Sequence, residues 1–283
     1  MSSHTQLTSH AQLTSSGQLQ SFVAQLDAYN RAHWGASDLP DEWRHYDYQA
    51  ILQKVLADFT PNKTQNHHFL RIAGQSGSGK TTQLLPAADA YFAKRGLAPV
   101  IVAARLFVDY HPHLTEIKAE FPPEKLRELT NEFSVSLMFL TLAALIQQGY
   151  DIILDVTLLD PFIERTLMQL LAAHKYTSRI FLLAVSKTIS DQFIAKRQGR
   201  VVNTATAEEF WHATHKALEF YGVEFHEIPI TVWSAFDLQP IYNGPISNAL
   251  TLVYKYQAIN ELPSTYPSEP ELLAAKVATA QTL

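Results

Sequence analysis

Apolar runs and amphipathic segments alternate along the middle of the chain. The apolar runs predict strands at 69–73, 99–104, 151–155, 179–185, 230–233 and 239–242. Helical spacing of apolar residues predicts helices at 80–95, 114–119, 123–148, 160–175, 188–198 and 206–221. Strands that are apolar at nearly every position are typical of a sheet buried on both faces. The pattern therefore predicts an α/β fold, in which helices cover both faces of a mostly parallel sheet.

The two ends of the chain differ from this alternating region. Residues 1–17 consist largely of Ser, Thr, His and Gln, and they repeat Gln-Leu-Thr-Ser. Such a composition buries too little apolar surface to fold, so it predicts a disordered tail. Residues 18–65 are predicted to form a helical extension, and residues 66–262 are predicted to form the α/β domain. The Pro- and Ala-rich segment 263–283 is predicted to be peripheral.

A predicted helix at about 47–59, within the extension, has one apolar face. Asp47 stands where an N-cap is expected, and Thr60-Pro61-Asn62 ends the helix. The apolar residues of this face are Tyr48, Ile51, Leu52, Val55, Leu56 and Phe59. The extension has no surface large enough to bury them, so we expect the face to pack on the α/β core. The helix is then either a scaffold that completes the core or a cover that limits access to an active site.

The turn between the first predicted strand and its helix carries the strongest chemical signal. Its sequence fits G-x-x-x-x-G-K-T, the phosphate-binding loop or P-loop. The predicted nucleotide-binding residues are Gly74, Gln75, Ser76, Gly77, Ser78, Gly79, Lys80, Thr81 and Thr82. In this motif the Lys80 ammonium reaches the β- and γ-phosphates, and the Thr81 hydroxyl holds Mg²⁺. A plain Gly- and Ser-rich turn is the alternative, but the full motif between a strand and a helix favours ATP and Mg²⁺ as cofactors.

Three further residues are candidates for phosphoryl transfer. Asp155 ends an apolar strand, where an acid in P-loop proteins orients Mg²⁺ or substrate, although it could instead cap the next turn. Arg197 and Arg200 follow the helix predicted at 188–198, and guanidinium groups suit the charge of a transferring phosphate. Solvated cations at a helix end are the alternative. We therefore predict Lys80, Asp155, Arg197 and Arg200 as catalytic residues, with Thr81 and Asp155 as metal ligands.

Composition narrows the possible partners. The net charge of −5 favours neither nucleic acid nor a membrane surface. The most apolar run, Phe133 to Ile146, is too short to span a bilayer and is expected to be a buried helix. The chain has no cysteine and no apolar signal-peptide segment, which fits a cytoplasmic protein. The histidines lack the spacing of a zinc site.

Several motifs together resemble those of the zeta toxin family. They are the P-loop, Phe107-x-x-x-His111-Pro112, the segment Gln148–Thr157 and Ala184-Val185-Ser186-Lys187. The resemblance extends from about residue 66 to 245. It implies a P-loop kinase that phosphorylates UDP-N-acetylamino sugars with ATP and Mg²⁺. It also implies that Arg197 and Arg200 clamp phosphates and that Thr157 contacts the sugar nucleotide.

The acceptor side departs from the family pattern at several positions. Arg105 stands where the family has its catalytic aspartate, and a guanidinium cannot accept a proton at neutral pH. Phe139 and Leu159 replace polar acceptor contacts, and Asp155 replaces a glutamate. The predicted substrate-binding residues are Arg105, Asp109, His111 and Thr157.

Two functions remain open from the sequence. One is a kinase for another small-molecule acceptor, with Asp109 or Asp155 as the base. The other is a nucleotide-binding pseudokinase or regulatory protein without transfer activity. The family resemblance further suggests an antitoxin partner, or an N-terminal segment that inhibits in cis.

Overall fold

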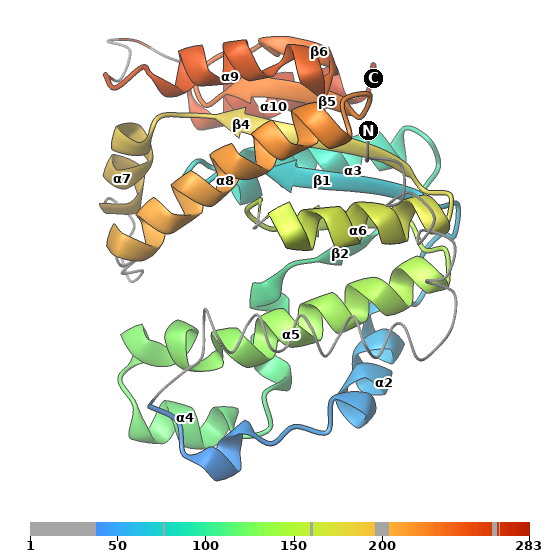
Figure 1. Cartoon of the computed structure of the whole chain (residues 1–283), viewed down its shortest axis with the longest axis vertical. Helices are drawn as coiled ribbons and strands as arrows, with labels where there is room; N and C mark the ends of the chain where they lie inside the picture. Colours follow the sequence, from blue (N-terminus) through green and yellow to red (C-terminus); the bar gives the residue numbers. More distant parts are fainter. Residues whose placement is uncertain (1–37, 76, 159–160, 196–203, 262–264, 266) are drawn as a thin grey trace, which may run out of the picture.

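The computed structural model is built around one six-stranded sheet (Figure 1). It describes residues 38–75, 77–158, 161–195, 204–261, 265 and 267–283. The predicted tail at 1–17 and the helix predicted to begin at residue 18 lie outside the described residues. The strands are β1 (His68–Ala73), β2 (Val100–Val102), β3 (Ile152–Asp155), β4 (Thr177–Ala184), β5 (Pro229–Ser234) and β6 (Tyr242–Pro245).

The sheet is parallel except at one edge, as predicted. The strand order is β2-β3-β1-β4-β5-β6, and only the last pair, β5 and β6, is antiparallel. β1 lies between β3 and β4, with Ile72 opposite both Asp155 and Phe181. The carboxyl ends of β1 and β3 therefore meet at the same edge of the sheet, which is where ligands bind in open α/β sheets.

Helices cover both faces of this sheet. They are α2 (Tyr48–Phe59), α3 (Leu85–Ala93), α4 (Leu114–Glu120), α5 (Leu126–Gln147), α6 (Pro161–Ala173), α7 (Lys187–Ala195), α8 (Thr204–Glu224), α9 (Leu250–Gln257) and α10 (Glu269–Ala280). Short 3₁₀ turns are η1 (Asp41–Arg44), η3 (Ala104–Leu106), η4 (Val108–Tyr110), η5 (Pro123–Lys125) and η6 (Ile246–Asn248). In Figure 1, α6 and α8 cross in front of the strands, and α5, α4 and α2 lie at the end opposite β6.

Two hydrophobic cores, one on each face, follow from the alternation of side chains along the strands. On β1, Phe69 belongs to the core that includes residues of α5, α6 and α8, whereas Leu70 belongs to the core that includes residues of α3. This arrangement confirms the predicted α/β fold with helices on both faces of a mostly parallel sheet.

The helix α2 packs on the core, as its apolar face predicted. Its N-cap is Asp47, whose Oδ1 accepts a hydrogen bond from Ala50 N at 3.0 Å. Val55 is fully buried in the core on the α5 side of the sheet. The ring of Tyr48 stacks on Phe133 of α5 with centroids 5.8 Å apart.

The helix α5 is a core helix. The helical stretch Pro123–Gln147 is long and apolar enough to cross a membrane by length and composition, but 83% of its most apolar window is buried inside the protein. A helix covered to this extent by its own fold behaves as the core helix of a folded domain. The sequence prediction of a buried helix at Phe133–Ile146 is therefore confirmed.

The C-terminal segment differs from the prediction. It was expected to be peripheral, but α10 packs against α3 and the first turn of the helix after the P-loop. Leu272, Lys276 and Ala280 are buried there. The helix begins with a capping box between Ser268 and Glu271, a start signal that the Pro- and Ala-rich composition concealed.

Burial of Lys276 makes the stability of the fold depend on pH. Its Nζ donates a hydrogen bond to the carbonyl of Asp237 at 3.2 Å. Burial lowers the pKa of Lys276 from 10.5 to about 8, and the charge of Asp237 opposes this shift only in part. Between these values the unfolded chain binds more protons than the folded chain, so the free energy of unfolding rises with pH from about 8 to 10.5.

We expect Lys276→Met to remove this dependence. Below pH 8 the wild type bears the full penalty of a buried charge, on the order of 3 kcal/mol, so the variant should be as stable as the wild type or more stable at pH 7. Urea unfolding at pH 7, 8.5 and 10 measures the difference. Lys255→Met, at an exposed position of α9, is the control. A variant that is less stable than the wild type at pH 7 and keeps the same pH slope would contradict this account.

Candidate active site

The P-loop leaves β1 in a turn that has no room for a side chain at two of its glycines. Gly74 has a φ of +136°, and a Cβ there would lie 3.0 Å from the carbonyl oxygen of Leu183 on β4. Gly77 has a φ of +81°, and its Cβ would lie 2.6 Å from the carbonyl oxygen of Ser190 on α7. Backbone rather than side chains therefore lines this turn, as a phosphate cradle requires.

The helix after the loop begins at Lys80, as predicted, but its first turn is π-helical. This turn, η2 (Lys80–Leu84), is closed by a hydrogen bond from Leu85 N to the carbonyl of Lys80. Pro86 lies in the first turn of α3 (Leu85–Ala93) and has no N–H to offer the Thr82 carbonyl, so no α-helical hydrogen bond joins these two residues where the π-helical turn passes into α3. The Lys80 Nζ donates to the carbonyl of Gln75 at 3.0 Å, so the ammonium lies over the loop.

The side chain of Gln75 anchors the loop. Its Nε2 donates to the carbonyl of Val185 at 2.6 Å and to Ser190 Oγ at 2.9 Å. The amide is buried between the end of β4 and α7. Only the backbone of Gln75 is thus left for a phosphate. The motif alone did not reveal this structural role.

Asp155 and Thr81 meet beside the loop. Thr81 Oγ1 donates to Asp155 Oδ2 at 3.1 Å, and Arg105 Nη1 donates to the same oxygen at 2.5 Å. Only 2% of the Asp155 side chain is exposed, compared with 37% of the Arg105 side chain. The structure therefore brings together the predicted metal ligands and places the cation of Arg105 directly on one of them, Asp155.

The donor set at this point fits Mg²⁺. A hydroxyl and a carboxylate are hard oxygen donors, and Mg²⁺ is usually held by one or two such groups together with water and substrate phosphates. The part of the chain that the structure describes contains no group of three or more His, Cys, Asp or Glu residues that could hold a metal by themselves. Thr81 and Asp155 would hold the ion together with a bound nucleotide.

A buried polar network lies behind the site, on the α6 side of β1. Arg71 forms an ion pair with Glu164 of α6, and its Nη2 donates to the carbonyl of Thr157 at 3.1 Å. Tyr221 of α8 donates to the same Glu164 carboxylate at 2.7 Å, and burial, followed by the charge of Glu164, raises the pKa of Tyr221 well above its usual range. The network fixes the segment that carries Thr157. This network was not predicted from the sequence, because no local sequence signal indicates that Arg71 of an apolar strand pairs with Glu164, 93 residues away.

The other predicted acceptor residues are in different surroundings. Asp109 lies in η4 and is exposed. His111 is only 3% exposed, and its ring contacts Tyr46 and Phe133. Its Nδ1 accepts from His113 N at 3.1 Å, so in the neutral ring Nε2 carries the proton toward Tyr46 Oη at 3.2 Å. Both ring nitrogens are engaged with the protein, which gives the ring a structural role here, and its contact with substrate stays a prediction.

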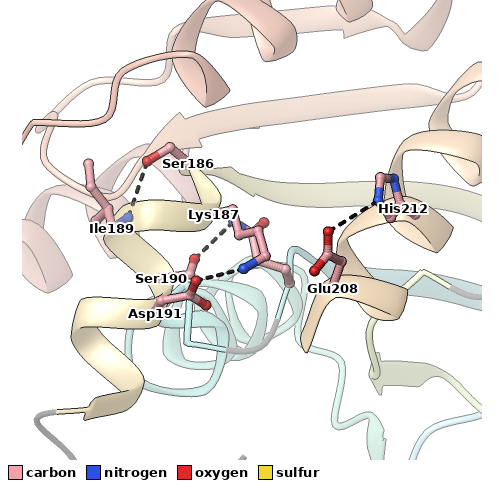
Figure 2. A network of polar contacts seen from close by, with 8 residues as sticks. Ser186, Lys187, Ile189, Ser190, Asp191, Glu208 and His212 are labelled. Atoms are coloured by element: carbon pink, nitrogen blue, oxygen red, sulfur yellow. Dashed lines mark hydrogen bonds and ion pairs between the residues drawn. The ribbon is translucent and has the colours of Figure 1, made fainter. Parts of the chain in front are cut away.

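The predicted phosphate clamps Arg197 and Arg200 lie outside the described residues, and so does the loop residue Ser76. The elements on either side of the two arginines are described. Figure 2 shows Lys187 of α7 paired with Asp191 at 2.8 Å, while Glu208 and His212 of α8 approach to 3.8 Å. The charge of Glu208 contributes to a raised pKa of Lys187, after the larger effect of the Asp191 hydrogen bond.

Comparison with known families settles the relationship of this chain. A family model described as zeta toxin matches residues 53–235, more than half of the sequence. The chain belongs to the zeta toxin family. Zeta toxins are a family of ATP-dependent kinases. The match begins within α2 and ends just after β5, so β6, α9 and α10 lie beyond it.

Solved structures share this fold. A chain of the PezAT chromosomal toxin–antitoxin system of Streptococcus pneumoniae is similar over 87% of this chain and 98% of its own length, with a TM-score of 0.60 and 19% identity. A chain of the AvrRxo1-ORF1:-ORF2 structure with ATP is similar over 95% and 90%, with a TM-score of 0.55 and 11% identity. No curated protein sequence matches this chain significantly. At such identities the likeness establishes the fold.

The contact between Gly77 and α7 can be tested with a matched pair of glycines. We expect Gly77→Ala to lower the free energy of unfolding by about 1–3 kcal/mol more than Gly96→Ala and to weaken ATP binding. Gly96 also has a positive φ, +69°, but a Cβ there meets nothing within 4 Å. Chemical unfolding and calorimetry with ATP measure the two effects. Equal losses in the two variants would show that backbone conformation alone, and not the contact with α7, limits residue 77.

The buried ring of His111 makes the protein sensitive to acid. Burial lowers the pKa of His111 from 6.5 to about 4, the charge of His113 adds to this, and Glu116 opposes it. Because the unfolded chain binds more protons between these values, the stabilisation present above pH 6.5 is lost as the pH falls to 4.

We expect His111→Gln to flatten this part of the stability profile by up to about 3 kcal/mol relative to wild type. Thermal unfolding between pH 4 and 7 measures the difference. His212→Gln, at an exposed ring on α8, is the control. An identical change with pH in wild type and His111→Gln would contradict the assignment.

Proposed function

We propose that this protein binds ATP in the P-loop and transfers its γ-phosphate to a hydroxyl of a small molecule. The single observation that carries the proposal is the contact of Thr81 with Asp155 at 3.1 Å, directly beside a loop that also holds Lys80. A structural Gly-rich turn has no need of a buried carboxylate at this point. The family of ATP-dependent kinases and a similar fold solved with ATP support the same reaction.

The residues have distinct roles in this mechanism. The turn from Gly74 to Gly79 surrounds the phosphates, and the Lys80 ammonium offsets negative charge on the β- and γ-phosphates. Thr81 and Asp155 would hold Mg²⁺, and the ion would supply positive charge to offset the charge that develops during transfer. Arg197 and Arg200 stabilise the equatorial oxygens of the transferring group.

The general base for the transfer has two candidates, Asp155 and Asp109. Arg105 cannot take the proton of the acceptor hydroxyl. Asp155 accepts two hydrogen bonds on one oxygen, whereas Asp109 is exposed two residues after Phe107. The acceptor carries a hydroxyl and belongs to nucleotide sugars or related nucleotides, by the family resemblance. Absence of the family base argues against efficient use of UDP-N-acetylglucosamine, because a lost general base costs roughly 10²–10⁴-fold in rate.

A second candidate function is nucleotide binding without transfer. The ion pair of Arg105 with Asp155 favours it, because the pair fills the position of the base with a cation. Incubation with γ-labelled ATP, Mg²⁺ and a panel of nucleotide sugars, nucleotides and nucleosides separates the two functions. Labelled product supports the kinase, and ATP binding without product or hydrolysis supports the regulatory protein.

The biological setting follows from the same relatives. The PezAT chain belongs to a toxin–antitoxin system, and AvrRxo1-ORF1 was solved together with AvrRxo1-ORF2. A protein antitoxin, or the N-terminal helical extension acting in cis, is therefore part of the proposal. The reaction takes place in the cytoplasm, where ATP is available.

We expect Lys80→Ala to weaken ATP binding at least about tenfold and to abolish transfer, while the fold is retained. The variant removes the cation that lies over the loop, and the loss of one charged hydrogen bond corresponds to about this factor. Calorimetry with ATP and Mg²⁺ measures it. Lys94→Ala, at an exposed residue beyond α3, is the matched control. Equal ATP affinity in wild type and Lys80→Ala would remove the P-loop from the proposed function.

A further inference from the structure

The ion pair of Arg105 with Asp155 occupies the oxygen that a metal would need. Asp155 Oδ2 accepts from Thr81 Oγ1 at 3.1 Å and from Arg105 Nη1 at 2.5 Å. A carboxylate oxygen has two lone pairs, so both are in use. The oxygen that faces Thr81 is also the one that a cation held by Thr81 would reach. A divalent cation and the Arg105 guanidinium therefore compete for one atom.

The two partners of this pair differ in their freedom to move. Asp155 ends β3 and is almost completely buried, so its carboxylate is fixed by the sheet. Arg105 lies in the short turn η3, and 37% of its side chain is exposed. Solvent can hydrate the partly exposed guanidinium when it leaves, and an arriving cation replaces its charge, so the exchange leaves no buried charge unpaired. When a divalent cation enters, Arg105 is the group that moves.

We propose that Arg105 is a built-in competitor of the divalent cation at Asp155, and that it sets how strongly nucleotide binding depends on Mg²⁺. This inference rests on the proposed binding of ATP to the P-loop. Without metal, the guanidinium neutralises the Asp155 carboxylate and so reduces the repulsion between this carboxylate and the phosphates of a bound nucleotide. With metal, the guanidinium must first be displaced, which weakens the apparent affinity for Mg²⁺.

The proposal requires opposite changes in two affinities, which a purely structural role of Arg105 would not produce. In Arg105→Gln, a non-hydrolysable ATP analogue should bind several-fold more weakly in EDTA, because the Asp155 carboxylate then repels the phosphates without compensation. Mg²⁺ should bind the protein–analogue complex about tenfold more tightly, because no charged hydrogen bond has to be broken first. Calorimetric titrations of the full-length chain measure both constants.

Two further variants sharpen the test. Arg165→Gln is the control, because Arg165 is a similarly exposed arginine whose ion pair, with Glu224, joins α6 to α8 and does not include Asp155. It should change neither constant. In an Asp155→Asn background, Arg105→Gln should no longer tighten Mg²⁺ binding, since the shared oxygen has lost its charge. Circular dichroism and thermal unfolding verify that each variant is folded.

The possible results separate this inference from the proposed function. Tighter Mg²⁺ binding and weaker metal-free nucleotide binding in Arg105→Gln, both dependent on Asp155, support it. Nucleotide binding by the wild type with unchanged or weaker Mg²⁺ binding in Arg105→Gln overturns the inference and leaves the P-loop function standing. A wild-type protein that binds the analogue neither with nor without Mg²⁺ overturns both.

Discussion

The candidate site depends on the parallel pairing of β1 with β3. In this register Ile72 lies opposite Asp155, so the last residues of both strands reach the same edge of the sheet. β1 also pairs with β4 and is covered by a hydrophobic core on each face. Because β1 has a neighbouring strand on each side and a core on each face, the chain must turn tightly where the strand ends at the sheet edge. That turn is the P-loop, and it passes Thr81 directly beside Asp155.

Polar groups buried behind this edge hold it in place. Arg71 points from β1 into the core on the α6 side, where Glu164 and Tyr221 complete its interactions. A buried ion pair contributes little net stability, because the loss of hydration offsets the attraction, but it tolerates few alternative arrangements. On the loop itself, Gln75 provides a similar anchor to β4 and α7. The site is thus positioned by directional contacts, with the hydrophobic cores supplying the bulk of the stability.

Features of the fold and site that are encoded in short sequence segments could be predicted, whereas contacts between residues far apart in the sequence could not. The first five strands, the capping by Asp47 and the turn of the P-loop are encoded in short segments, so the pattern of residues was sufficient. The sixth strand was expected at 239–242 but lies at Tyr242–Pro245, because its position is set by antiparallel pairing with β5 and not by an apolar run. Pairings between distant residues were not accessible, and the ion pairs of Arg71 and Arg105 both belong to this class. The burial of His111 was not foreseen for the same reason, because it depends on Tyr46, which precedes α2, and on Phe133 of α5 packing around the ring. The packing of α10 was missed because its composition resembles a peripheral segment, although a capping box marks its start.

The central claim is that the turn after β1 holds the phosphates of ATP, with Thr81 and Asp155 beside them. A crystal structure of the full chain with Mg²⁺ and a non-hydrolysable ATP analogue tests it most directly. The account expects the β- and γ-phosphates within hydrogen-bond distance of the backbone N–H groups of the turn and of Lys80 Nζ, with the metal on the Thr81 hydroxyl. A nucleotide bound away from this turn, or phosphates in the turn with the metal held elsewhere, would contradict it.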